Sequence, residues 1–330
     1  MMTENLTEKP DRKNLLLKVW CVCTAFLILM LTTRSSFLFP INNWDDVNSY
    51  FSMGKGMMNG MVIYRDLYDQ KGPYLYLLFG ISYLISHRTF LGVFVFEVAA
   101  AAVTLYFAGK YILRYSGFKA ALFMIPILGA GMYSSWSFYW GGAAEEFCLP
   151  MFAASVYFLE GILKDRYSGR ELAGVTALTG IFAGVTAQVK YTMLGFYAAW
   201  FIMAVLWIAK TAGVRDTFLK GFRFILFALV PSVPWFIYFL ATGSLDDWYR
   251  CYIYNNLFFY TDVSGVDSFV SKLYAIAKTL YWLIQDSFSY FIFIIPGFIL
   301  QFVREKGVLR RISSLFVFAL MYFVIFIGGN

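Results

Sequence analysis

Residues 15–33 read LLLKVWCVCTAFLILMLTT, an apolar run of 19 residues that contains a single charge, Lys18. About 20 apolar residues in a helix cross the hydrocarbon core of a bilayer, so this run predicts a membrane-spanning helix. A polar N-terminus with Lys9, Arg12 and Lys13 precedes it, and no small-residue cleavage site follows it. We therefore expect a retained first span, with the N-terminus in the cytoplasm.

The rest of the chain has the same character. Of its 330 residues 60% are hydrophobic and only 14% are charged, which is too little polar surface for a soluble domain of this length. The sequence predicts an all-α integral membrane protein of about nine transmembrane helices, forming one multi-span domain over residues 1–330. The eight further runs long enough to cross are 89–109, 120–140, 147–163, 172–188, 192–209, 222–241, 287–303 and 312–328.

Two shorter apolar runs, 73–86 and 273–286, have lengths that favour interfacial or re-entrant helices. If 73–86 does not cross, 18 of the 27 Lys and Arg residues lie on the cytoplasmic side, as the positive-inside rule requires. A crossing would invert that count. The net charge of +7 therefore indicates topology rather than a nucleic-acid partner.

This topology places three polar segments on the extracytoplasmic face of a multi-pass cell-membrane protein. They are the large first loop, 34–88, a short turn at 141–146 and a third loop at 242–278. Because all three leave the membrane on one side, they can share one site. We see no fixed-period repeat and no inverted pair of halves.

The first loop contains two adjacent acids, Asp45 and Asp46, in the segment NNWDDVNSYF (42–51). Apolar residues then recur every three or four positions at 50, 53, 57 and 61, which predicts a short amphipathic helix lying on the membrane. Acidic residues at a helix start also act as N-caps, which is the structural explanation for one of the pair. Two adjacent carboxylates exceed what capping needs, so Asp46 is the stronger functional candidate.

The same loop ends in YRDLYDQKGP (64–73). Here Arg65 and Lys71 can bind an anionic group, and the Gly-Pro turn brings the backbone close to the interface. The structural alternative is that both cations snorkel or pair with Asp66 and Asp69.

The second outer turn, GGAAEEF (141–147), places Glu145 and Glu146 at the mouth of a span, where repulsion and partial desolvation disfavour adjacent carboxylates. A structural turn needs one carboxylate at most, which favours a function. Glu97 within the second expected span and Lys190 between two later spans are weaker candidates for the same site. His87 is the only histidine, which argues against a Ser-His-Asp triad or a histidine metal site.

In this order, the motifs resemble the GT-C class of membrane glycosyltransferases, particularly the bacterial group related to protein O-mannosyltransferases and lipid A aminoarabinose transferases. The similarity covers roughly residues 10–200, and the YRDxxxxKGP run is its most specific part. It implies a GT-C-like module over about 10–241. Relatives usually have more spans, so we expect this chain to be truncated at its C-terminal end relative to them.

The resemblance implies a polyprenyl-phosphate-linked sugar donor, a lipid, glycan or protein acceptor on the extracytoplasmic face, and inversion at the anomeric carbon. A carboxylate would take the acceptor proton, and cations would stabilise the departing phosphate. Some members of this class use a divalent metal, and oxygen ligands would suit Mg²⁺ or Mn²⁺. By position, Asp46 or Asp45 matches the base, Glu145 or Glu146 the second acid, and Lys71, Arg65 and Asp69 the segment that binds the donor phosphate.

The main alternative is a transporter or flippase of a lipid-linked saccharide, which would also place charged residues near the membrane. The absence of inverted repeats and the one-sided polar loops argue against it. A non-catalytic membrane scaffold is a third hypothesis, but it has no use for paired acids or the KGP turn.

Overall fold

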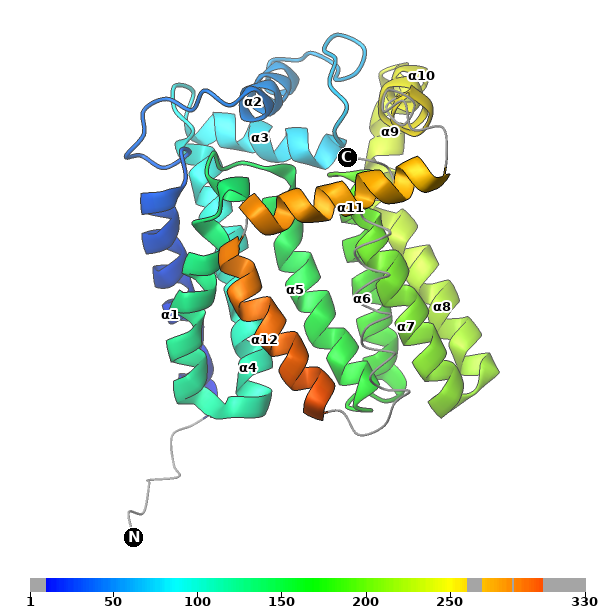
Figure 1. Cartoon of the computed structure of the whole chain (residues 1–330). Coiled ribbons are helices and arrows are strands. Elements are labelled where there is room, and N and C mark those ends of the chain that lie inside the picture. Colours follow the sequence, from blue (N-terminus) through cyan, green and yellow to red (C-terminus); the bar gives the residue numbers. More distant parts are fainter. Residues whose placement is uncertain (1–9, 260–268, 287, 305–330) are drawn as a thin grey trace.

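The computed structural model describes residues 10–259, 269–286 and 288–304. Within these residues the chain is helical and has no strands, so the expected all-α class is confirmed. Figure 1 shows one set of helices side by side in a bundle and further helices across one end of it. The helices of the bundle are α1 (Pro10–Thr32), α4 (Leu91–Tyr133), α5 (Ala144–Leu163), α6 (Gly169–Ala187), α7 (Leu194–Ala212), α8 (Val214–Leu229) and α12 (Phe288–Arg304).

Five helical stretches in the described residues are long and apolar enough to cross a bilayer. They identify the chain as a membrane protein with several apolar helices. The five are Arg12–Thr32, Leu91–Tyr133, Ala144–Leu163, Tyr191–Ala212 and Val214–Ala241.

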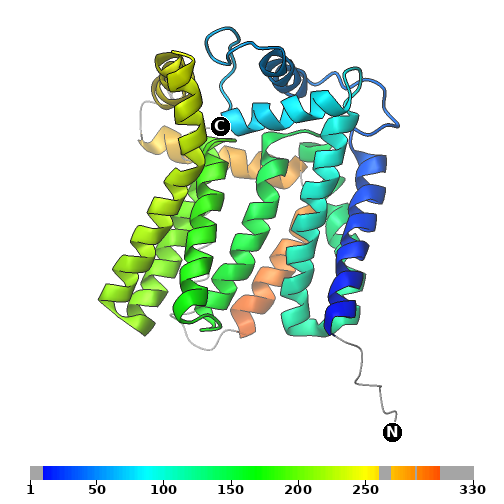
Figure 2. The same ribbon diagram turned by 180° about the vertical axis from the view of Figure 1, so that it is seen from behind.

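Helix α4 contains two of the expected spans, 89–109 and 120–140. Its helical backbone is interrupted at Gly117, where φ is 82° and ψ is 178°. Leu105 before the break and Ile125 after it belong to the same buried cluster. The two arms therefore pack against each other, and Figure 2 shows α1 beside α4 from the opposite side of the bundle.

Helix α6 corresponds to the expected span 172–188 but is rich in Gly, Ala and Thr, and it is not among the five. A Cβ atom on Gly180 or Gly184 would collide with the α8 carbonyl oxygens of Phe224 and Ala228. Small residues here let the two backbones approach closely, as at helix interfaces in membranes.

Helix α12 corresponds to the expected span 287–303, and the expected span 312–328 lies outside the described residues.

The outer face of α8 and of α9 (Val233–Ala241) is apolar. Phe222, Ile225, Leu229 and Ile237 are each more than half exposed. A continuous apolar surface of this kind is disfavoured in water and is the surface that lipid chains cover.

Helices α2 (Asp45–Met58) and α3 (Pro73–Ile85) lie across one end of the bundle (Figure 1). Tyr50 and Met53 are buried as the periodicity predicts, and they pack against α3. The two helices lie close together because Gly54 has no side chain: a Cβ atom there would lie 2.6 Å from the carbonyl carbon of Phe79. That α2 rests on the membrane stays a prediction. Met61 follows the helix and is exposed.

Helix α11 (Phe269–Asp286) also lies across this end of the bundle in Figure 1. It includes the second short apolar run, 273–286. The short α10 (Leu245–Trp248) and the π-helix η4 (Tyr249–Phe259) follow α9 and lie at the same end. The polar loops therefore gather at a single end of the bundle.

Candidate functional site

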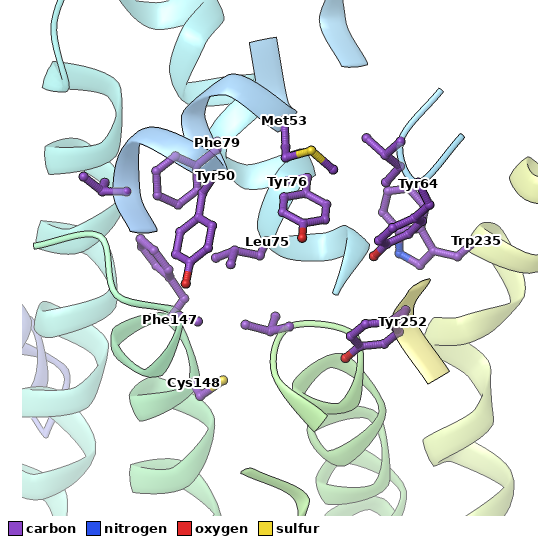
Figure 3. Close-up of a cluster of buried hydrophobic side chains, with 14 of the residues drawn as sticks. Tyr50, Met53, Tyr64, Leu75, Tyr76, Phe79, Phe147, Cys148, Trp235 and Tyr252 are labelled. Carbon is purple, nitrogen blue, oxygen red and sulfur yellow. The ribbon is translucent and has the colours of Figure 1, made fainter. Parts of the chain in front are cut away.

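The hydroxyl group of Tyr50 lies where two polar segments meet. It donates a hydrogen bond of 2.9 Å to Asp46 Oδ2 on the same helix. It also interacts electrostatically with Asp69 from the loop before α3 and with Glu145 at the start of α5. Figure 3 shows the Tyr50 ring pointing from α2 toward Phe147 on α5. The first and second polar loops therefore contribute to one cluster of charged residues, which we call the Tyr50 cluster.

The electrostatic environment keeps Tyr50 protonated. Burial raises the pKa of its phenol well above the ordinary value, and the adjacent Asp46 carboxylate raises this pKa further. The phenol therefore remains a hydrogen-bond donor to Asp46 at physiological pH. In the sequence, the apolar periodicity places Tyr50 only on the apolar face of its helix. The spacing of four residues from Asp46 was the available signal, because side chains at i and i+4 meet on a helix.

The two adjacent aspartates have different surroundings. Both lie in the first turn of α2, where a negative charge is favourable, but the N-cap residue is Trp44 and neither aspartate caps the helix. Asp46 is exposed and accepts the bond from Tyr50. Asp45 is also exposed, and within the described residues it forms no hydrogen bond or ion pair. Only Asp46 is joined to the Tyr50 cluster.

Asp69 holds its own loop in place. Its Oδ1 accepts the backbone N–H of Gln70 at 2.7 Å, and its Oδ2 accepts the hydroxyl of Ser49 at 3.3 Å. It also interacts with the hydroxyl of Tyr76, which accepts the backbone N–H of Lys71 at 2.8 Å. These contacts hold the backbone that leads into the KGP turn against α2, through Ser49, and against α3, through Tyr76.

The side chain of Lys71 is partly exposed and has no hydrogen bond or ion pair within the part of the chain that the structure describes. The expected alternative, pairing with Asp69, is not formed there. Its position is set by Gly72, whose N–H donates to the Val189 carbonyl at 3.0 Å. A Cβ atom on Gly72 would collide with the backbone of Gln188, so the turn needs glycine. The Lys71 ammonium is therefore available to an anionic ligand.

The two adjacent glutamates also have different partners. Glu145 forms an ion pair with Lys190, both partly exposed, and it interacts electrostatically with Lys71. Glu146 is 2% exposed and accepts the backbone N–H of Ala143 at 3.2 Å at the start of α5. Glu145 and Lys190 thus belong to the Tyr50 cluster, whereas Glu146 is buried beside it.

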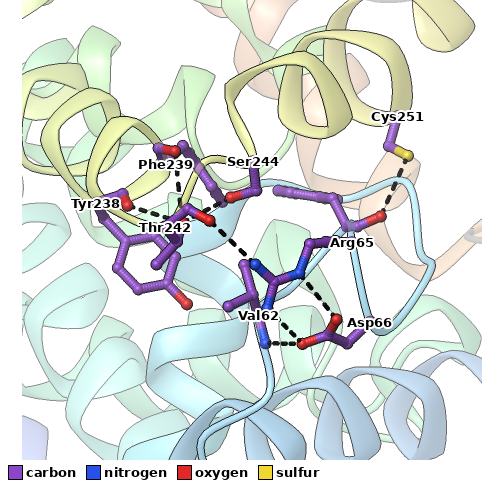
Figure 4. A network of polar contacts seen from close by, with 9 residues as sticks. Val62, Arg65, Asp66, Tyr238, Phe239, Thr242, Ser244 and Cys251 are labelled. Carbon is purple, nitrogen blue, oxygen red and sulfur yellow. Dashed lines mark hydrogen bonds and ion pairs between the residues drawn. The ribbon is translucent and has the colours of Figure 1, made fainter.

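Arg65, unlike Lys71, has partners in the protein. Its Nε bonds Asp66 Oδ1 at 2.9 Å, and its Nη1 donates to the Thr242 carbonyl at 3.0 Å (Figure 4). The hydrogen bond from Arg65 and the one from the backbone of Val62 lower the pKa of Asp66. The structural alternative for Arg65, pairing with Asp66, is therefore confirmed, and the residue ties the first loop to the third.

The third loop packs against the first through η4. Asn256 Nδ2 donates to the Gln70 carbonyl at 2.9 Å, and the Tyr252 hydroxyl donates to the Ala187 carbonyl. Cys251 Sγ contacts the Tyr64 carbonyl at 3.8 Å. All three polar loops therefore meet, as their common side of the membrane predicts. No sequence motif indicated Asn256 or Tyr252.

Across the described residues, no group of three or more His, Cys, Asp and Glu side chains is placed to hold a metal ion. The divalent metal that the resemblance allows therefore stays a prediction. Comparisons with protein-family models, with curated proteins and with solved structures each found no match. The resemblance to GT-C enzymes therefore depends on the sequence motifs alone.

Proposed function

We propose that this protein is a GT-C-type glycosyltransferase that moves a sugar from a polyprenyl-phosphate donor to an acceptor, with inversion. The observation that carries the proposal is the Tyr50 cluster. It combines an exposed carboxylate, Asp46, with an unpaired cation, Lys71, at one end of an apolar helical bundle. A lipid-linked donor suits this position because its chain can lie in the membrane while its phosphate reaches the cation.

In the proposed reaction, Asp46 takes the proton of the acceptor hydroxyl while the acceptor oxygen attacks the anomeric carbon. The bond between that carbon and the phosphate oxygen breaks, and the phosphate leaves with its bonding electrons. Attack from the face opposite the leaving group inverts the anomeric centre. Lys71 stabilises the charge that develops on the phosphate, and the Glu145–Lys190 pair fixes the electrostatic environment of Lys71.

The proposal includes the topology expected from the sequence: about nine spans, a cytoplasmic N-terminus and a site outside the cytoplasm of the cell. Membrane lipids would surround the bundle. The acceptor is a lipid, glycan or protein hydroxyl, and no nucleic acid takes part. A divalent metal is not required in any step above.

A direct assay separates this enzyme from a flippase or transporter. The purified chain in proteoliposomes is given a polyprenyl-phosphate donor with a radiolabelled sugar, together with candidate acceptors from the cell envelope. We expect labelled sugar in the acceptor and release of free polyprenyl phosphate. A donor that changes leaflet but stays intact would replace the enzyme proposal with transport.

Lys71→Ala tests the phosphate role, and Lys55→Ala is the matched control. Lys55 is an exposed lysine on α2 that lies 6.0 Å from the Tyr83 ring centre, outside the Tyr50 cluster. A hydrogen bond to a charged group contributes about 1.5–3 kcal/mol, so Lys71→Ala should weaken donor binding roughly 10- to 150-fold. Equal donor affinity in the two folded variants would exclude the phosphate role of Lys71.

A further inference from the structure

A second acidic pair lies beside the Tyr50 cluster, at the turn that precedes α5. Glu97 of α4 is 1% exposed and Glu146 of α5 is 2% exposed, and the two carboxyl groups interact with each other. Glu97 accepts the backbone N–H of Gly142, and Glu146 accepts that of Ala143. In the described residues no lysine or arginine forms an ion pair with either group.

Buried oxygen atoms without partners surround this pair. Glu97 Oε2, Ser35 Oγ and the Tyr133 hydroxyl are all buried and form no hydrogen bond within the described part of the chain. Ser35 interacts with Glu97, and Tyr133 interacts with both carboxyl groups. The three atoms come from the start of the first loop and from both arms of α4.

The backbone at Gly141 shows how closely these groups converge. A Cβ atom there would lie 2.9 Å from Ser35 Oγ and still closer to Thr33 Oγ1 and Glu97 Oε1. The residue has φ 70°, which glycine adopts without strain. Only glycine fits at position 141, because these three oxygen atoms lie close against its backbone.

Two neighbouring carboxylates in a buried site repel each other, and each loses its hydration. Buried polar atoms in folded proteins are nearly always satisfied by protein, water or ions. A positive ion among these groups would satisfy both requirements together. Carboxylate and hydroxyl oxygens are ligands for hard cations and not for soft transition metals.

We propose that Glu97, Glu146, Ser35 and Tyr133 bind a hard cation, of the class of Na⁺, Mg²⁺ or Ca²⁺. The site joins the first loop to both arms of α4 and to the start of α5. It adjoins the Tyr50 cluster through Glu145, which interacts with Glu146, but it consists of other side chains and does not depend on the proposed glycosyltransfer. Its consequence is that the folded chain is more stable when the ion is bound, because a ligand that binds only the folded state stabilises it.

The test is the thermal unfolding of the purified full chain, first stripped of cations with a chelator and exchanged into choline chloride. NaCl, MgCl₂ and CaCl₂ are then titrated separately at constant ionic strength. We expect one of the three to raise the Tm in a saturable manner. Glu97→Gln and Glu146→Gln should remove the rise, whereas Glu171→Gln, at an exposed position on α6, should keep it.

Ion binding to the unmodified chain tests the proposal even if the Gln variants fail to fold. Equilibrium dialysis of the unmodified chain with ²²Na⁺ or ⁴⁵Ca²⁺, and metal analysis after exposure to Mg²⁺, should give one bound ion per chain. A Tm that no cation raises above the choline control would overturn the proposal. The proposal would also be overturned if Glu97→Gln and the unmodified chain had the same Tm and neither Tm changed with added cation. In that case a proton shared between the two carboxyl groups, and not a bound ion, would stabilise the pair.

Discussion

The sharpest test of the proposed mechanism is Asp46→Asn. Asparagine keeps the size of the side chain and an oxygen that can accept the 2.9 Å bond from Tyr50, but it removes the charge and the basicity. Asp46 is exposed, is not the N-cap of α2 and forms no ion pair within the described residues. Its replacement should therefore change the free energy of unfolding by less than about 1 kcal/mol.

The effect on catalysis should be much larger. General-base assistance contributes roughly 10²- to 10⁴-fold, or about 3–5 kcal/mol of barrier. We expect kcat for sugar transfer to fall by that factor while donor affinity stays within a few-fold. The assay is single-turnover transfer of labelled sugar in proteoliposomes, with the Tm of each variant measured in parallel.

Asp45→Asn is the control. It removes the same charge at the neighbouring residue, whose side chain does not contact the Tyr50 cluster. Near-normal transfer by Asp46→Asn together with loss in Asp45→Asn would move the base to Asp45. Full activity in both variants would refute the role of this acidic pair in catalysis and leave the enzyme proposal without its base.

Three further outcomes follow from the geometry. Tyr50→Phe removes one hydrogen bond to a charged acceptor, so transfer should fall roughly 10- to 150-fold with the fold retained; an unchanged rate would exclude the phenol from the site. Gly54→Ala should destabilise the chain by about 1–3 kcal/mol in denaturant unfolding, because α2 and α3 are in backbone contact, whereas Gly131→Ala, with open space around its Cβ position, should not. Cysteines introduced at Asn59 and Arg88 should both react with an impermeant thiol reagent from outside; reaction at Asn59 alone would mean that α3 crosses the membrane.

The pairs of adjacent acids mark the limit of what a sequence motif can resolve. Each pair looks redundant in sequence, and position alone could only rank Asp46 above Asp45. In the structure Asp46 meets Tyr50, Glu145 meets Lys190, and Glu146 turns inward to Glu97. Successive residues on a helix point about 100° apart, so neighbours in sequence face different surroundings, and only the packing defines those surroundings.

The sequence by itself determined the membrane class, the helical content and the gathering of polar loops at one end. Those properties depend on the length of apolar runs and on the placement of charges, and both can be counted segment by segment without knowledge of the packing. The tertiary structure decided that Arg65 pairs with Asp66, that α2 packs on α3, and that Tyr50 occupies the centre of the charged cluster. These features depend on contacts between segments far apart in the chain, and the absence of a side chain at single glycines such as Gly54 and Gly72 sets how closely the backbones approach.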